Sequence, residues 1–225
     1  MSTATTPPAR APRRTSSRIE RKKLVVPAAL LILLVLMIAN TKFFFGSQAT
    51  QAAPGTFSPV SFAEEKYESE IAPDIDKRAT DVVTVATASK ADPAAAAKQY
   101  GVVTGSSAAV YSVKFTGTAA KPDANGLMQV AVPGLPADTK VFVQTGPAVN
   151  GTAIRDATGK VEFSQFKNQI DYQNVGAELN NQVKKLVLTD LDKTAIEGKQ
   201  VDVVGAFQLI NPASFVVTPV KIEVK

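Results

Sequence analysis

The 225-residue chain contains no cysteine, histidine or tryptophan. Without thiolates or imidazoles, the sequence excludes structural disulfides, a cysteine nucleophile, a Ser-His-Asp triad and the usual zinc sites. Any catalysis would depend on carboxylate pairs, Ser-Lys dyads or oxygen-ligated metals. The acidic residues do not follow the spacing of a calcium-binding loop. We therefore expect no catalytic residue, no metal and no cofactor.

Acidic residues are almost absent from the first 23 residues, which hold seven Arg and Lys but only Glu20. Subtracting this tail's +6 from the +5 of the whole chain leaves −1 for residues 24–225. A tail rich in Ser, Thr, Pro and Arg without apolar periodicity is typical of disorder. The slightly acidic remainder argues against a nucleic-acid partner, whose affinity depends on neutralising phosphates.

Charge is also absent from Leu24 to Ala39, and three Phe residues at 43–45 follow after Asn40, Thr41 and Lys42. Residues 24–45 are long enough to span a bilayer as a helix, with Lys42 reaching the headgroups. A cleaved signal peptide is the alternative, but Lys42 and three Phe precede the small residues that could mark a cleavage site. The basic tail, residues 1–23, would then stay cytoplasmic. We expect a single-pass cell-membrane protein with an extracytoplasmic C-terminal domain.

A spacer of Gly, Ser, Gln, Ala and Pro, residues 46–60, is expected to follow the anchor. Residues 61–101 are predicted to form short helices before the main domain. Ser61 and Glu64 have the form of a capping box, and Pro73 should kink or end the first helix.

Two further segments complete this helical preface. Residues 81–88 fit either a strand or a short buried helix. Asp92 followed by Pro93 predicts a helix over 93–100, and Gly101 is expected to end it in a left-handed conformation.

The apolar period changes to two after Val102. Three strands, a helix and two strands follow, which is the order of the OB-fold, and Gly205 suits the sharp bend of a barrel strand. The predicted fold class is mainly β with helices (α+β). It is an OB-like five-stranded antiparallel barrel over residues 102–225, with a helix between strands three and four, preceded by short helices and an N-terminal transmembrane helix. The strands are predicted at 110–116, 127–132, 140–145, 200–210 and 215–224, and the helix at 163–186 with an interruption at 171–174.

Polar residues gather in two stretches after the third predicted strand. Residues 146–156 combine turn-forming Gly with amide, hydroxyl and charged side chains, and residues 163–172 mix aromatics with amides, as sugar sites often do. Arg binds carboxylates, phosphates and sugar hydroxyls. The candidate ligand-binding residues are Asn150, Gly151, Thr152, Arg155, Asp156, Asn168, Gln169 and Tyr172.

The same residues have a structural interpretation. Because Arg155 and Asp156 are neighbours, they need not pair with each other, and Arg155 could instead bridge the loop to a helix acid such as Glu178. Asn150 could cap a turn, while the aromatics fill the core and the amides satisfy backbone groups. A carboxylate pair formed by Asp156 with Glu162 or Asp171 would point to a glycan-acting enzyme instead.

Several segments together resemble a bacterial family of predicted periplasmic lipoproteins of unknown function. The resemblance covers residues 57–225. Family members are often associated with ABC-type importers of simple sugars, so the resemblance implies an accessory or binding role in carbohydrate uptake. This chain has no lipobox cysteine, so the apolar span would replace the lipid as anchor. The segments are ADPAAAAKQYG at 91–101, GTAIRD at 151–156, FSQFKNQIDY at 163–172, AELN at 177–180, VVGAF at 203–207 and VTPVKIEV at 217–224.

The leading hypothesis is a non-enzymatic, membrane-anchored extracytoplasmic module. Its expected partners are the membrane, ABC transporter subunits and a small sugar or sugar-acid ligand. A carboxylate-based enzyme acting on glycans and a structural envelope protein are the alternatives.

Overall fold

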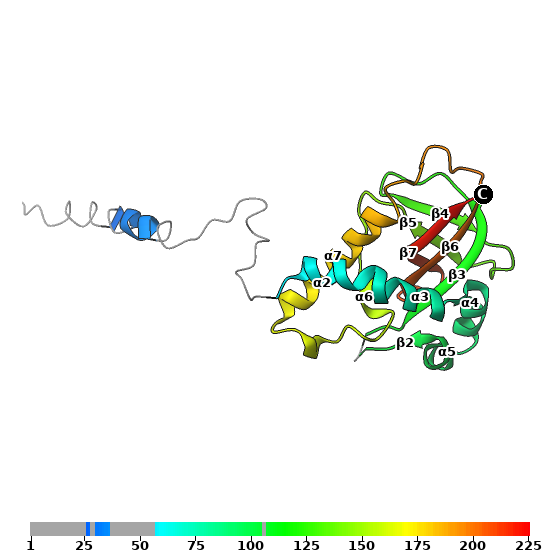
Figure 1. The fold of residues 1–225 in the computed structure, drawn as a ribbon, viewed down its shortest axis with the longest axis horizontal. Coiled ribbons are helices and arrows are strands. Elements are labelled where there is room, and N and C mark those ends of the chain that lie inside the picture. Colours follow the sequence, from blue (N-terminus) through cyan, green and yellow to red (C-terminus); the bar gives the residue numbers. More distant parts are fainter. Residues whose placement is uncertain (1–25, 28–29, 37–56, 105–106) are drawn as a thin grey trace, which may run out of the picture. The chain divides into compact units, whose positions relative to one another are not determined.

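The computed structural model describes residues 26–27, 30–36, 57–104 and 107–225 (Figure 1). The chain divides into two compact units, Met1–Ala53 and Pro54–Lys225, which are described separately. In the first unit, residues 26–27 and 30–36 are helical. Among the described residues, no helix has both the length and the apolar character needed to cross a bilayer. The expected basic tail and most of the expected span and spacer lie outside the described residues.

Five strands of the second unit close into a barrel (Figure 1). They are β3 (Val110–Ala119), β4 (Leu127–Ala131), β5 (Lys140–Gln144), β6 (Gln200–Gln208) and β7 (Ser214–Val224). The order β3-β4-β5-β7-β6 returns to β3, which confirms the predicted OB-fold topology. One expectation was wrong, because β5 and β7 run parallel. A ring of five strands cannot alternate direction all the way round, so closure requires one parallel pair.

The interior of the barrel follows the alternation of the strands. On β3, the side chains of Tyr111, Val113 and Phe115 point inward and are at most 4% exposed, while the intervening residues face outward. The Tyr111 ring stacks on Phe207, whose centroid lies 5.5 Å away. Gly205 lies at a register shift between β6 and β7, where a Cβ atom would come within 2.3 Å of the Thr218 carbonyl oxygen. The bend predicted there is a β-bulge.

The helical preface begins earlier than predicted. Helix α2 (Pro59–Lys66) has Ser58 as its N-cap, and the Ser58 hydroxyl accepts a hydrogen bond from the Ser61 amide at 3.3 Å. Pro59 is well placed in the first turn because its missing N–H needs no partner there, so the capping box predicted at Ser61 does not form. Pro73 does not end the helix. The chain instead stays helical through a π-helical turn, η2 (Tyr67–Ile71), and continues into α3 (Ala72–Arg78), which contains Pro73.

The segment that fitted either a strand or a helix is mostly helix. After the two-residue strand β1 (Thr80–Asp81), helix α4 (Val82–Ala91) starts where the Asp81 carboxylate accepts from the amides of Val83 and Thr84. Helix α5 (Pro93–Tyr100) confirms the prediction made from Asp92 and Pro93. Gly101 is not left-handed, with φ −103°, because the chain continues directly into β2 (Gly101–Val102), which pairs with β3.

Three helical elements connect β5 to β6, namely α6 (Ala153–Asp156), η3 (Phe163–Gln165) and α7 (Gln169–Leu186). The interruption predicted at 171–174 was wrong, because the break lies just before Asn168, which caps α7. The apolar face of α7 contributes fully buried Val175, Leu179 and Val183 to a second core shared with α2, η2 and α3. Phe163 and Ile170, on the same predicted periodicity, are 50% and 67% exposed.

Candidate ligand site

The candidate site forms where the loop after β5 folds back over the outer face of the barrel. Gln144, the last residue of β5, is 6% exposed. Its Nε2 donates to the Asn150 carbonyl at 3.0 Å and to Thr218 Oγ1 at 2.7 Å, and its Oε1 accepts from the Asn150 amide at 2.8 Å. One buried side chain therefore holds the loop against β5 and β7.

The turn between β3 and β4 packs against the start of the same loop. Gly126 has a φ of +77°, and a Cβ atom there would lie 1.7 Å from the Gly146 carbonyl oxygen, so only glycine fits. The amide and hydroxyl of Thr145 both donate to the Gly126 carbonyl, at 2.8 and 2.9 Å. This close approach places Asn125 beside the loop.

A cavity of about 340 Å³ lies between the loop and the strands. We call it the Asn150 cavity. Its volume is at the small end of the range for ligand pockets, about 300–1,000 Å³, which suits one compact ligand. Its lining residues are Asn125, Leu127, Gln144, Ala148, Asn150, Gly151, Thr152, Ala153, Gln208, Ile210, Val216 and Thr218.

The lining combines amide and hydroxyl groups with apolar walls, and every lining residue is uncharged. Within the described part of the chain, the side-chain amides of Asn125 and Asn150 make no internal hydrogen bond. They are exposed at the rim and available to a ligand. Ile210 and Val216, 80% and 38% exposed, supply apolar surface beside them. Such a lining suits a neutral ligand with several hydroxyl groups, since nothing in it neutralises a charge.

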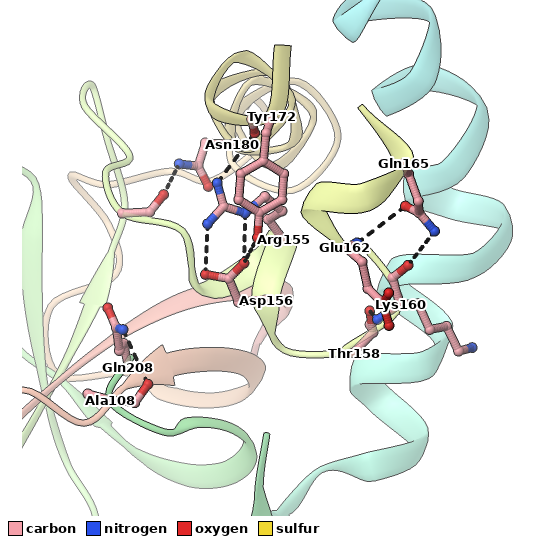
Figure 2. A network of polar contacts seen from close by, with 11 residues as sticks. Ala108, Arg155, Asp156, Thr158, Lys160, Glu162, Gln165, Tyr172, Asn180 and Gln208 are labelled. Carbon is pink, nitrogen blue, oxygen red and sulfur yellow. Dashed lines mark hydrogen bonds and ion pairs between the residues drawn. The ribbon is translucent and has the colours of Figure 1, made fainter. Parts of the chain in front are cut away.

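The structure divides the predicted site residues between two places. Asn150, Gly151 and Thr152 line the cavity. Arg155 and Asp156, 7% and 8% exposed, do not line it. They pair with each other (Figure 2), with Nε to Oδ1 at 2.7 Å and Nη2 to Oδ2 at 3.0 Å. The suggested bridge from Arg155 to Glu178 does not form, because the bidentate pair already satisfies the guanidinium.

Tyr172 completes this group, which we call the Arg155 cluster (Arg155, Asp156 and Tyr172). The Tyr172 hydroxyl donates to Asp156 Oδ1 at 3.3 Å, and its carbonyl accepts from Arg155 Nη1 at 3.3 Å. Burial, reinforced by the negative charge of Asp156, raises the pKa of Tyr172 above its ordinary value. The cluster fixes α6, which begins at the cavity-lining Ala153, against α7.

A second contact joins α7 to the loop. Asn180 is 5% exposed, and its Nδ2 donates to the Gly151 carbonyl at 2.8 Å (Figure 2). The remaining candidates lie at the start of α7. Asn168 accepts from the Asp171 amide and donates to its carboxylate, both at 2.9 Å, and Gln169 is the exposed first residue of the helix. Neither lines the Asn150 cavity.

The cavity also uses residues that sequence reasoning missed. Gln144, Gln208 and Thr218 were assigned only to strands, and Asn125 only to a turn. The available signal was Gln144, a polar residue that follows the apolar residues 141–143 of the strand and precedes Thr145 and Gly146. Thr218 had no comparable signal, because it lies 74 residues from the Gln144 amide that it contacts.

The carboxylates considered for catalysis are engaged separately. Asp156 pairs with Arg155, Asp171 bonds Asn168, and Glu162 accepts from the Ser164 hydroxyl at 3.4 Å. Within the described ranges, no group of acidic residues is placed to hold a metal ion.

Comparison with known proteins gives a family and a fold. The family model described as "Predicted periplasmic lipoprotein (DUF2291)" matches residues 30–223. A crystal structure of an OB-fold protein from Thermotoga maritima MSB8 is similar with a TM-score of 0.61 and 24% sequence identity, covering 76% of this chain and 99% of that one. At this identity, the likeness supports the fold alone. The comparison with curated proteins found no match.

Proposed function

The chain belongs to the family of predicted periplasmic lipoproteins, and from that premise we propose that it is a non-enzymatic, membrane-anchored extracytoplasmic module that binds a small neutral sugar. The Asn150 cavity carries this proposal. Its free rim amides match sugar hydroxyls, and Ile210 and Val216 match the apolar C–H face of a sugar ring.

The chemistry of the cavity supports binding rather than turnover. General acid–base catalysis needs a titratable side chain within hydrogen-bond reach of the reacting group. The cavity lining contains no Asp, Glu, Lys or Arg. A neutral sugar fits this lining better than a sugar acid, because a carboxylate would lose hydration without meeting a cation.

The anchoring part of the proposal depends on the sequence. Residues 24–45 are the span that would hold the module at the membrane, and the basic residues before them would keep the N-terminus in the cytoplasm. Subunits of an ABC-type sugar importer are the proposed protein partners, in keeping with the associations that the family resemblance implies.

Thermal unfolding of the full chain in detergent, with a panel of ribose, glucose, galactose and glucuronate, tests the ligand. A bound sugar at 100 times its Kd should stabilise the fold by about 2.7 kcal/mol. We expect one of the neutral sugars to raise Tm and glucuronate to leave it unchanged. If none of the neutral sugars raises Tm, the sugar-binding proposal is wrong.

Two variants locate the binding site. Asn150→Ala removes a rim amide and should abolish or strongly reduce the rise in Tm. Asn174→Ala changes an exposed amide on α7 outside the cavity and should leave the rise intact. Co-purification of importer subunits with the full chain from membranes tests the partner separately, and both variants should retain it if docking does not involve the cavity.

A further inference from the structure

A row of three side chains crosses the outer face of the barrel next to the Asn150 cavity. Strand β5 lies between β4 and β7, and the register places Phe142 opposite Gln129 on β4 and opposite Val216 on β7. Residues that lie directly opposite each other on neighbouring strands point to the same face of the sheet. These residues therefore share one surface, which we call the Phe142 row (Gln129, Phe142 and Val216).

The Phe142 row faces away from the barrel interior. Gln129 is exposed, Val216 is 38% exposed and Phe142 is partly exposed. Among the described residues, Phe142 and Val216 belong to neither apolar core. Packing inside the fold therefore does not explain an aromatic ring at this position. The residues before and after each member of the row point inward and are at most 2% exposed, namely Met128, Val130, Val141, Val143, Phe215 and Val217.

The Phe142 row continues the surface of the Asn150 cavity. Val216 belongs to both, because it also lines the cavity. On β5, the next outward residue after Phe142 is Gln144, which lines the cavity as well. Adjacent strands lie about 4.8 Å apart, so Gln129 is roughly 10 Å from Val216 across the row. A ligand that fills the cavity and extends past Val216 therefore meets the Phe142 ring next.

We propose that the ligand of the Asn150 cavity is a neutral disaccharide whose second ring lies on the Phe142 row, an inference that rests on the proposed sugar binding. The second ring stacks its C–H face on Phe142, because the face of an aromatic ring is partially negative and sugar C–H groups are partially positive. The Gln129 amide can both donate to and accept from the hydroxyls of that ring. The exposed Lys140, two residues before Phe142, ends the uncharged surface, which limits the site to one additional neutral ring.

Isothermal titration calorimetry of the full chain tests this inference, in a detergent whose headgroup is not a sugar. The probes are ribose, glucose and galactose and the disaccharides maltose, cellobiose, lactose and melibiose. We expect at least one disaccharide to bind about 10-fold more tightly than any of the monosaccharides. Phe142→Leu keeps an apolar side chain but removes the ring, so it should abolish most of this gain and leave the Kd of the monosaccharide unchanged. Phe163→Leu changes an exposed aromatic of η3 outside the cavity and the row, and it should alter neither affinity.

The outcomes separate this inference from the proposed function. If none of the sugars binds, both are wrong. If a monosaccharide binds and no disaccharide binds more tightly, sugar binding stands and the second ring has no site on the Phe142 row.

A second variant covers the case in which Phe142→Leu lowers the thermal unfolding temperature. Gln129 is exposed, so Gln129→Ala should leave the fold and the monosaccharide Kd unchanged while it reduces the disaccharide gain. If a disaccharide binds more tightly than the monosaccharides and Gln129→Ala and Phe142→Leu both keep the full gain, the second ring lies elsewhere and the inference is overturned.

Discussion

The guanidinium carbon of Arg155 lies 3.8 Å from the centroid of the Tyr172 ring. The cation therefore has a carboxylate in its plane and an aromatic face against it, both inside the fold. An arginine held in this way is typical of a structural role, because its donors and its charge are already engaged.

Replacing Arg155 by Ala should destabilise the fold without abolishing the proposed sugar binding. The change leaves the Asp156 carboxylate buried without its cation, and breaking such a pair costs about 3–5 kcal/mol. Urea unfolding followed by circular dichroism measures the free energy of unfolding, and the sugar-induced rise in Tm measures binding. The double variant with Asp156→Ala should recover part of the lost stability. Loss of the sugar response at unchanged stability would instead place Arg155 in the ligand site.

Replacing Tyr67 by Phe should stabilise the protein. Tyr67 is 2% exposed in the π-helical turn η2, and its hydroxyl has no hydrogen-bond partner among the described residues. Removing this group should raise the free energy of unfolding at pH 7 by about 1 kcal/mol, since a buried unpaired polar group costs roughly 1–3 kcal/mol. A drop in stability at pH 7 would indicate that the hydroxyl has a partner after all.

The same variant should change the alkaline limit of stability. Burial, reinforced by the negative charge of Glu68, raises the pKa of the Tyr67 phenol above its model-peptide value of 10.0. The Tyr67 phenol therefore ionises at a higher pH in the folded state than in the unfolded state. Its contribution to stability is fully present below pH 10 and is lost as the pH rises above 10. Urea midpoints measured between pH 7 and about pH 11 should therefore fall more steeply for the wild type than for Tyr67→Phe. Parallel profiles would contradict this.

Two glycine-to-alanine changes should have opposite effects. At Gly205, a Cβ atom would approach the Thr218 carbonyl to 2.3 Å and the Pro219 Cα to 2.9 Å, so the bulge between β6 and β7 must distort. We expect a loss of about 1–3 kcal/mol or more. At Gly176, inside α7, the nearest atom would be Arg155 Nη1 at 3.6 Å, an ordinary contact. Alanine there should stabilise the helix by about 0.4–1 kcal/mol. Equal effects on the two urea midpoints would contradict the idea that the bulge requires glycine at position 205.

These residues show why the fold was more predictable than the site. The barrel was predictable because inward-facing and outward-facing residues alternate along each strand, and this alternation is visible in the local sequence. Tyr111, Val113 and Phe115 on β3 are an example. The cap at Asp92 was predictable for the same reason, since all its partners lie within three residues. Ser58 and Ser61 lie only three residues apart, and either could cap the first helix. Pro59 favours the first turn of a helix, so Ser58 is the N-cap.

The cavity depends on contacts that no local pattern encodes. Asn125, Asn150 and Val216 meet because β5 pairs with both β4 and β7. Gln144 contacts Thr218 across the parallel pair of β5 and β7, which the expected antiparallel barrel did not contain. The Arg155–Asp156 pair was missed for a different reason. Neighbouring residues can pair in a short helix such as α6 when a third side chain, here Tyr172, covers one face of the pair.

The hydrogen bonds of Gln144 lead to the final prediction, which concerns the loop that covers the Asn150 cavity. Gln144→Ala should leave the Asn150 amide and carbonyl and the Thr218 hydroxyl without their partner. Loss of these contacts should lower the free energy of local opening by about 2 kcal/mol. The Asn150 amide should then exchange its hydrogen roughly 30-fold faster. The sugar response should weaken as the rim loses its fixed position. Gln129→Ala on the exposed outer face of β4 is the matched control and should change neither quantity. If Gln144→Ala leaves the exchange of Asn150 unchanged, Gln144 does not hold the loop, and the cavity must owe its shape to the Asn180 contact with Gly151 instead.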